Sequence, residues 1–212
     1  MSRNTFDRLA GLAGVAAFSP LWVPALVGVI AEDGFPAFYK QQRIGRAGKP
    51  FLLWKLRSMR NNNSGPQITA RGDARITRVG RIIRKYKIDE LPQFWNLVTG
   101  ELSLVGPRPE VARYVDLADP VWQRVLSVRP GITDLATLVY RNEEELLAAA
   151  PDPERLYRET ILPAKLKLNL DYLENRTWWT DIKLIVMTAR YSFFPGGFDS
   201  DKIRQGLLEQ NS

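Results

Sequence analysis

The chain has 212 residues, which suits one domain of catalytic size with attachments better than two full domains. It contains no cysteine and no histidine, which excludes disulfides, thiolate metal sites, cysteine nucleophiles, the Ser-His-Asp triad and a histidine general base. The net charge of +7 points to an anionic partner, which could be nucleic acid, a phosphorylated ligand or acidic lipid.

An uncharged apolar segment occupies residues 9–30, directly after Arg3 and Arg8. It could be a membrane-spanning helix, because at about 1.5 Å per residue it would cover the roughly 30 Å hydrocarbon core. It could also be a signal peptide with a cleavage pattern at residues 29–31, although the apolar run exceeds the usual length of about 7 to 15 residues. A third interpretation is a re-entrant hairpin that enters and leaves by the same leaflet.

The prolines in this segment favour the hairpin. Pro20 has no N–H and its ring clashes with the carbonyl of Ala16, so the helix must bend there, and Pro24 removes a second hydrogen bond. The hydroxyl of Ser19 can bond to a carbonyl one turn earlier, which satisfies a group that the break frees. Each half of the segment is about 15 Å long, enough to penetrate one leaflet.

The next part of the chain predicts a β-hairpin, a loop and a basic helix. The β-prone runs 37–41 and 50–56 flank a turn at residues 45–48. Residues 61–73 are polar and rich in turn formers, which predicts a mobile surface loop. Residues 74–88 predict an amphipathic helix with a strongly basic face, a pattern that is by itself also typical of a solvated helix surface.

Helical patterns dominate the second half, so the predicted fold class is α+β, mainly helical with a short β-hairpin. Asp119 followed by Pro120 is a typical helix start. The last helix carries adjacent tryptophans that suit either a core or a membrane interface. The expected helices cover residues 111–117, 119–128, 143–150, 153–175 and 178–194. The expected organisation is a membrane hairpin, a catalytic domain and a tail, over residues 1–36, 37–195 and 196–212.

Asp89 and Glu90 are consecutive acids after the basic helix and form the main catalytic candidate. If Asp89 is an N-cap, Pro92 falls in the first turn of a helix over residues 90–97, and both carboxylates can serve one phosphate-binding site. An aspartate can attack phosphorus, and a neighbouring glutamate can hold Mg²⁺ against phosphate oxygens. Taken alone, an Asp-Glu pair is more often a simple helix cap.

Several cationic residues are candidates for phosphate binding. The Pro-Arg-Pro sequence at 107–109 is a stiff loop that presents an arginine, whose planar fork suits phosphate. An Arg-Pro-Gly sequence follows at 129–131, and the second β-prone run ends with alternating cations. Each of these residues, taken alone, is most often a surface salt-bridge partner. The candidates are Lys55, Arg57, Pro107, Arg108, Pro109 and Arg129.

The combination resembles a known family. KLRSM, RVGRIIRKYKIDELPQFWNLVTGELSLVGPRPE and RPGIT follow a broken apolar segment in this order, as in the bacterial sugar transferases, the monotopic phosphoglycosyl transferases, in a small single-domain form. The resemblance extends over residues 5–190. It implies transfer of a sugar 1-phosphate from a nucleoside diphosphate sugar, usually a UDP-sugar, to polyprenol phosphate with release of UMP. It also implies Mg²⁺ as cofactor and a place at the cytoplasmic face of the bacterial inner membrane, on anionic phospholipid, where glycan assembly begins.

The resemblance also implies residue roles. Asp89 would be the nucleophile that carries a covalent phosphosugar, and Glu90 the Mg²⁺ ligand or a helper in activating the acceptor. The Pro-Arg-Pro loop would lie near the phosphates. Ser19 and Pro20 would form the break of the re-entrant helix, with Arg8 at its start.

Two departures limit what the resemblance carries over. The sequence after Gly131 differs from that of many relatives, so sugar or nucleotide contacts there cannot be transferred. Asn169 stands where relatives often have an acid, and Asp171 is not assigned that role.

Two other classes of function compete. A non-catalytic membrane-surface adaptor would need only the hairpin and the basic face, and it predicts that Asp89→Asn leaves function intact. A nucleic-acid-binding protein would use the basic helix, but the sequence contains no recognised binding module, so no nucleic-acid partner is expected.

Overall fold

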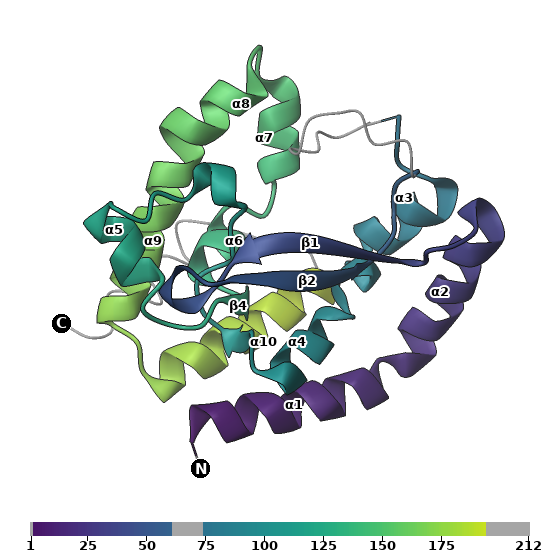
Figure 1. The fold of residues 1–212 in the computed structure, drawn as a ribbon, viewed down its shortest axis with the longest axis horizontal. Coiled ribbons are helices and arrows are strands. Elements are labelled where there is room, and N and C mark those ends of the chain that lie inside the picture. The colour runs from purple at the N-terminus through teal and green to yellow at the C-terminus, as the bar shows by residue number, and fades with distance from the viewer. Residues whose placement is uncertain (1, 61–73, 194–212) are drawn as a thin grey trace.

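The computed structural model describes residues 2–60 and 74–193, and it confirms a mainly helical fold with small sheets. The predicted surface loop at 61–73 and tail at 196–212 lie outside these residues, and the division into three parts stays a prediction. Figure 1 shows the β-hairpin crossing the centre of the molecule, with the long N-terminal helix along one edge and helices packed around the hairpin. The helices are α1 Arg3–Ala17, α2 Ser19–Asp33, α3 Arg78–Lys85, α4 Gln93–Thr99, α5 Pro120–Val125, α6 Leu135–Val139, α7 Glu143–Ala149, α8 Pro153–Leu156, α9 Leu162–Glu174 and α10 Trp178–Phe193.

The apolar segment forms a bent pair of helices. α1 and α2 meet at Phe18 with an angle of 62° between them. The Ser19 hydroxyl donates to the carbonyl of Ala16 at 2.7 Å, which is the group that Pro20 leaves without its helical partner. Pro24 lies inside α2 without ending it. Within residues 2–60 and 74–193, only this bent pair, and no single helix, is long and apolar enough to cross a membrane.

Glycines bring α1 close to α4. A Cβ on Gly14 would lie 2.3 Å from the ring of Phe94, and one on Gly11 would lie 2.8 Å from the Cβ of Leu97. Side chains at either position would therefore force the helices apart. This packing joins the bent pair directly to the helix that follows the two acids.

The antiparallel hairpin runs longer on its first strand than expected. β1, Phe38–Ile44, pairs with β2, Pro50–Leu56, in a register that runs from Phe38 opposite Leu56 to Ile44 opposite Pro50. A 3₁₀ turn, Arg46–Gly48, connects them, with Gly48 at φ +73°. The second strand has the predicted bounds, whereas the first extends beyond its predicted end.

A second, parallel pair of strands was not predicted. β3, Ser103–Val105, pairs with β4, Gly131–Thr133, and each is short. Their continuation is tight, because a Cβ on Gly131 would lie 2.2 Å from the nitrogen of Gly106. The Pro-Arg-Pro motif follows β3 and the Arg-Pro-Gly motif leads into β4, so this pairing brings the two motifs together.

The helices of the first half differ from the sequence prediction. α3 is shorter than the expected 74–88 because Thr77 is extended and caps it, accepting from the amide of Gly80 at 2.8 Å. The predicted helix at 111–117 is wrong, since only Ala112–Tyr114 forms a 3₁₀ turn. Val111 and Val115 on either side are β-branched and extended.

The C-terminal half agrees more closely. Asp119 caps α5 through the amide of Val121 at 2.8 Å, as predicted. The expected helix over 153–175 is continuous but contains a π turn, Tyr157–Ile161, between α8 and α9. α6 was not predicted. A buried hydrophobic cluster that includes Trp122 of α5 and Leu162 of α9 holds the two helices together.

Candidate active site

Asp89 and Glu90 lie in a 3₁₀ turn, Ile88–Glu90, between α3 and α4. The prediction that Asp89 caps a helix over 90–97 is wrong. An N-cap residue needs extended backbone, whereas Asp89 is inside a helical turn and α4 begins only at Gln93. Lys87 enters the turn with φ +56°, and Glu90 at the end of the turn contacts Lys55 of the hairpin.

Two cations converge on Glu90. The Lys55 ammonium, from β2, lies 3.0 Å from Glu90 Oε1, and Arg108 Nη2, from the loop after β3, lies 2.7 Å from the same oxygen. The side chains of Lys55 and Glu90 are each 18% exposed. Residues from three separate parts of the chain therefore meet in one partly buried cluster.

The two acids have opposite electrostatic environments. Burial and then the charge of Glu90 raise the pKa of Asp89 to about 6. Burial would also raise the pKa of Glu90, but Arg108 and Lys55 outweigh it and hold this pKa well below the usual value. Asp89 Oδ1 is buried and has no hydrogen-bond partner. The pair therefore combines a glutamate whose pKa is lowered with a more basic aspartate whose Oδ1 has no hydrogen-bond partner, the division typical of catalytic carboxylates.

Hydrogen bonds to backbone groups hold the loop that carries Arg108. The Arg108 amide donates to Asp134 Oδ2 at 3.3 Å, and Asp134 is fully buried and also caps α6. The carbonyl of Pro107 accepts from the amide of Gly131 at 3.0 Å, and the carbonyl of Pro109 accepts from Arg43 Nη1 at 2.9 Å. These contacts place the Arg108 side chain against Glu90.

The profile of the family described as bacterial sugar transferase matches residues 1–195. This chain belongs to the bacterial sugar transferase family. The sugar transferase is 36% identical to a UDP-N-acetylgalactosamine-undecaprenyl-phosphate N-acetylgalactosaminephosphotransferase of Aeromonas hydrophila, over 89% of this chain and 43% of the relative. It is 34% identical to a UDP-glucose:undecaprenyl-phosphate glucose-1-phosphate transferase of Caulobacter vibrioides, over 89% of this chain and 68% of the relative.

A third relative also matches most of this chain. The sugar transferase is 34% identical to an undecaprenyl-phosphate galactose phosphotransferase of Salmonella typhimurium, over 89% of this chain and 40% of the relative. The chain thus spans less than half the length of the Aeromonas and Salmonella proteins. Its matched part includes the acids and the Arg108 loop.

Not every predicted site residue joins this cluster. Asp89, Glu90, Lys55 and Arg108 come together, whereas Arg57 donates to the carbonyls of Asp33 and Gly34, at 2.7 Å each, where α2 ends. In this sugar transferase Arg57 thus fastens α2 to β2.

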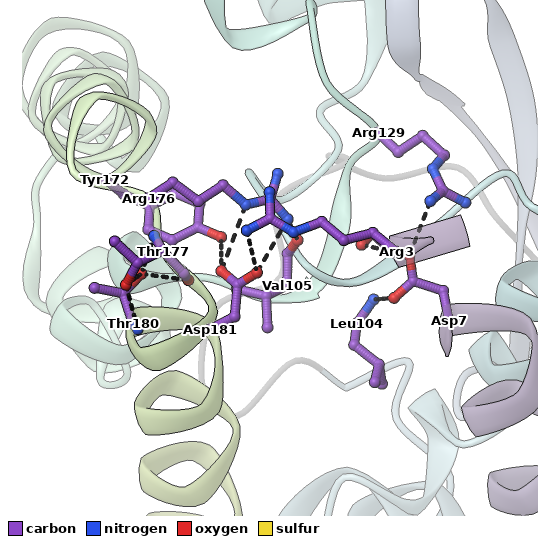
Figure 2. Close-up of polar contacts among 11 residues, drawn as sticks. Arg3, Asp7, Leu104, Val105, Arg129, Tyr172, Arg176, Thr177, Thr180 and Asp181 are labelled. Carbon is purple, nitrogen blue, oxygen red and sulfur yellow. Dashed lines mark hydrogen bonds and ion pairs between the residues drawn. The ribbon is translucent and has the colours of Figure 1, made fainter. Parts of the chain in front are cut away.

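Arg129 and Arg8 also lie elsewhere. Arg129 pairs with Asp7 of α1 at 2.9 Å and donates to Asn4 at 2.8 Å, and Figure 2 shows it pointing to α1. Arg8 lies against Gly100 at the end of α4. These two residues connect the bent helix pair to the body of the protein.

The sequence prediction missed four residues that support the Arg108 loop. Asp134 could have been found, because an aspartate before a short apolar run is an N-cap pattern. Arg43 and Glu110 form an ion pair at 3.6 Å, and Tyr157 donates to Glu110 at 2.5 Å. No local pattern marks these contacts.

A divalent metal is compatible with the acids of this sugar transferase. Within the described ranges, no group of three or more His, Cys, Asp or Glu side chains could hold a metal by itself. Mg²⁺, however, commonly uses one or two carboxylates together with substrate phosphate oxygens. Asp89 and Glu90, with a buried unpartnered oxygen on Asp89, fit such a shared site.

Proposed function

We propose that this sugar transferase moves a sugar 1-phosphate from a UDP-sugar to undecaprenyl phosphate, with Asp89 as the nucleophile. The observation that carries the proposal is the pair of adjacent acids in opposite environments, Asp89 buried with an unpartnered oxygen and Glu90 neutralised by two cations. The names of the three relatives support undecaprenyl phosphate as acceptor, and two of them support a UDP-sugar as donor.

The reaction runs in two displacements. A carboxylate oxygen of Asp89 attacks the phosphorus that bears the sugar, and the bond from that phosphorus to the bridging oxygen breaks, so that UMP leaves with the electron pair. An oxygen of undecaprenyl phosphate then attacks the same phosphorus and the Asp89 carboxylate is released. The product is a polyprenyl diphosphate sugar, and no histidine is needed.

Glu90, Lys55 and Arg108 would neutralise or orient the charged groups of the site and the substrate. Glu90 would hold Mg²⁺ together with the diphosphate, and the metal when bound supplies neutralisation of the charge on the leaving nucleotide. Lys55 and Arg108 keep Glu90 ionised and oriented. Arg108 presents a planar guanidinium that can turn from Glu90 to a phosphate oxygen.

The proposed location is the cytoplasmic face of the bacterial inner membrane, where glycan assembly begins. The bent pair α1–α2 would act as a re-entrant hairpin in one leaflet, and the basic surface of α3 would contact anionic headgroups. Support comes from the 62° bend and from the exposure of large apolar side chains on both helices. This placement would bring Asp89 to the depth of the acceptor's phosphate.

The experiment that tests the function measures UMP release by detergent- or nanodisc-held protein. The assay contains undecaprenyl phosphate, Mg²⁺ and a panel of UDP-sugars, with Asp89→Asn alongside. We expect one donor to give UMP, and the variant to give neither UMP nor an intact-mass adduct of one phosphosugar. Wild-type activity that persists in Asp89→Asn would refute the nucleophile, and no release or adduct with any UDP-, GDP- or dTDP-sugar would favour the adaptor.

A further inference from the structure

We infer that Asp7, on the first helix of the bent pair, is a positioning residue that sets the place of Arg108. The inference rests on the proposed function, because Arg108 matters through its contact with Glu90. It gives α1 a role in the active site in addition to that of an anchor.

Asp7 is a buried carboxylate that makes three contacts to the body of the protein. It is 3% exposed. Its carboxylate accepts from the Ser103 hydroxyl at 2.9 Å and from the Leu104 amide at 3.1 Å, and it pairs with Arg129 Nη2 at 2.9 Å. Arg129 also donates to Asn4, one helical turn earlier on α1. Figure 2 shows Asp7 pointing out of α1 toward Leu104 and Arg129.

These contacts hold both short parallel strands at once. Ser103 and Leu104 belong to β3, which leads into the Arg108 loop, and Arg129 precedes β4. Asp7 thus joins the two strands to one point on α1. One carboxylate can make all of these contacts because its two oxygens offer several lone pairs.

The backbone between β3 and Arg108 is restrained by hydrogen bonds to β4. The Gly106 amide donates to the carbonyl of Thr133 at 3.1 Å, and the Gly131 amide donates to the carbonyl of Pro107 at 3.0 Å. Both flanking residues of Arg108 are prolines with restricted φ. A shift of β3 against α1 is therefore passed to the Arg108 guanidinium.

A second tie keeps the same end of α1 in place. Arg3 lies 3.3 Å from Asp181 of α10, and Arg176 donates to the carbonyl of Val105 at 2.9 Å (Figure 2). Removing the Asp7 charge therefore leaves α1 docked through Arg3 and through its packing on α4. The expected result is a local change near β3 and not the loss of the helix pair.

The test uses Asp7→Asn in the full chain, with Asp116→Asn as the matched control because Asp116 is exposed. The asparagine keeps the size and one acceptor but loses the ion pair with Arg129. We expect UMP release to fall roughly 10- to 100-fold in kcat, with the KM for the donor changed by about twofold at most, since a displaced catalytic group costs rate more than binding. The control should match the wild type.

Two further readouts separate positioning from a general structural defect. Hydrogen exchange should accelerate in residues 103–110 and 129–134 and stay unchanged in α9. In an Arg108→Gln background, Asp7→Asn should change the single-turnover rate of adduct formation by about twofold at most, because residues that act through one another are not additive. The inference would be overturned if hydrogen exchange stayed unchanged in those segments, or if it accelerated throughout the chain. It would also be overturned if Asp7→Asn caused its full loss of rate in the Arg108→Gln background.

Failure of the inference and failure of the proposed function give different results. If the wild type releases UMP and Asp7→Asn matches it, the inference fails alone. If the wild type releases no UMP with any donor, the proposed function fails, and hydrogen exchange by itself decides whether Asp7 holds the Arg108 loop.

Discussion

Asn96 joins α4 to the β-hairpin and shows how one polar side chain supports the site. It is fully buried. Its Oδ1 accepts from the Trp54 amide at 3.1 Å, and its Nδ2 donates to the carbonyl of Leu52 at 2.8 Å and to Glu101 at 2.7 Å. These bonds occupy the outer backbone groups of β2, the strand that carries Lys55. Asn96 thus fixes the distance between the hairpin and the helix that follows Glu90.

Asn96→Leu should lower the free energy of unfolding by about 2 to 4 kcal/mol, because the leucine has a similar volume but leaves buried backbone groups of β2 without partners. Urea or thermal unfolding in detergent measures the change. Asn142→Leu is the control, since Asn142 is exposed and makes no side-chain cap, and it should differ little from the wild type. Equal stability of the two variants would contradict the assigned role of Asn96.

At the scale of elements, the break between α1 and α2 has a local cause. Pro20 removes a helical hydrogen bond and Ser19 satisfies the carbonyl that is freed. Pro24 removes another bond but lies inside α2, which continues through it. The position of the bend is therefore determined at Phe18 and not at the second proline.

Ser19→Ala combined with Pro20→Ala should straighten the pair. The chain has no native cysteine, so cysteines placed at Leu9 and Val27, both more than half exposed, give unique spin-label sites. A straight helix would put these positions about 27 Å apart, farther than in the bent pair. Pulsed electron paramagnetic resonance measures the distance. Pro24→Ala is the control and should leave it unchanged, whereas an unchanged distance in the double variant would show that tertiary packing imposes the bend.

At the scale of the whole molecule, the bent pair leaves an apolar surface uncovered. Its large exposed side chains are Leu9, Leu12, Leu21, Val23, Val27 and, just after α2, Phe35. A surface of this kind marks an interaction site. In the proposed function this site is the lipid leaflet.

Val27→Glu should weaken binding to vesicles made of neutral and anionic phospholipid, because an acid within the hydrocarbon region costs about 2.5 to 3.5 kcal/mol. Flotation on a density gradient measures the bound fraction. Leu146→Glu is the control: Leu146 is 50% exposed, comparable to 60% for Val27, but it lies on α7. Equal binding of both variants would mean that α2 does not enter the leaflet.

By itself, the sequence determined the features whose causes are local. The break at Ser19 and Pro20, the strand Pro50–Leu56 and the Asp119 cap follow from proline chemistry, alternation and capping, which act over a few residues. The order of the DELPQ and GPRP motifs was also enough to identify the family that the profile match shows. The same motifs predicted Asp89 and Glu90 as the catalytic pair.

Only the tertiary structure decided which cations serve the acids. Lys55 and Arg57 alternate on one strand and Arg108 and Arg129 stand in similar proline motifs, yet only Lys55 and Arg108 reach Glu90. The others are held by α2 and α1, and the parallel strands that bring the two proline motifs together form across a long connection. Local periodicity carries no signal for contacts between residues as far apart as Asp7 and Arg129, so their places depend on how the helices pack.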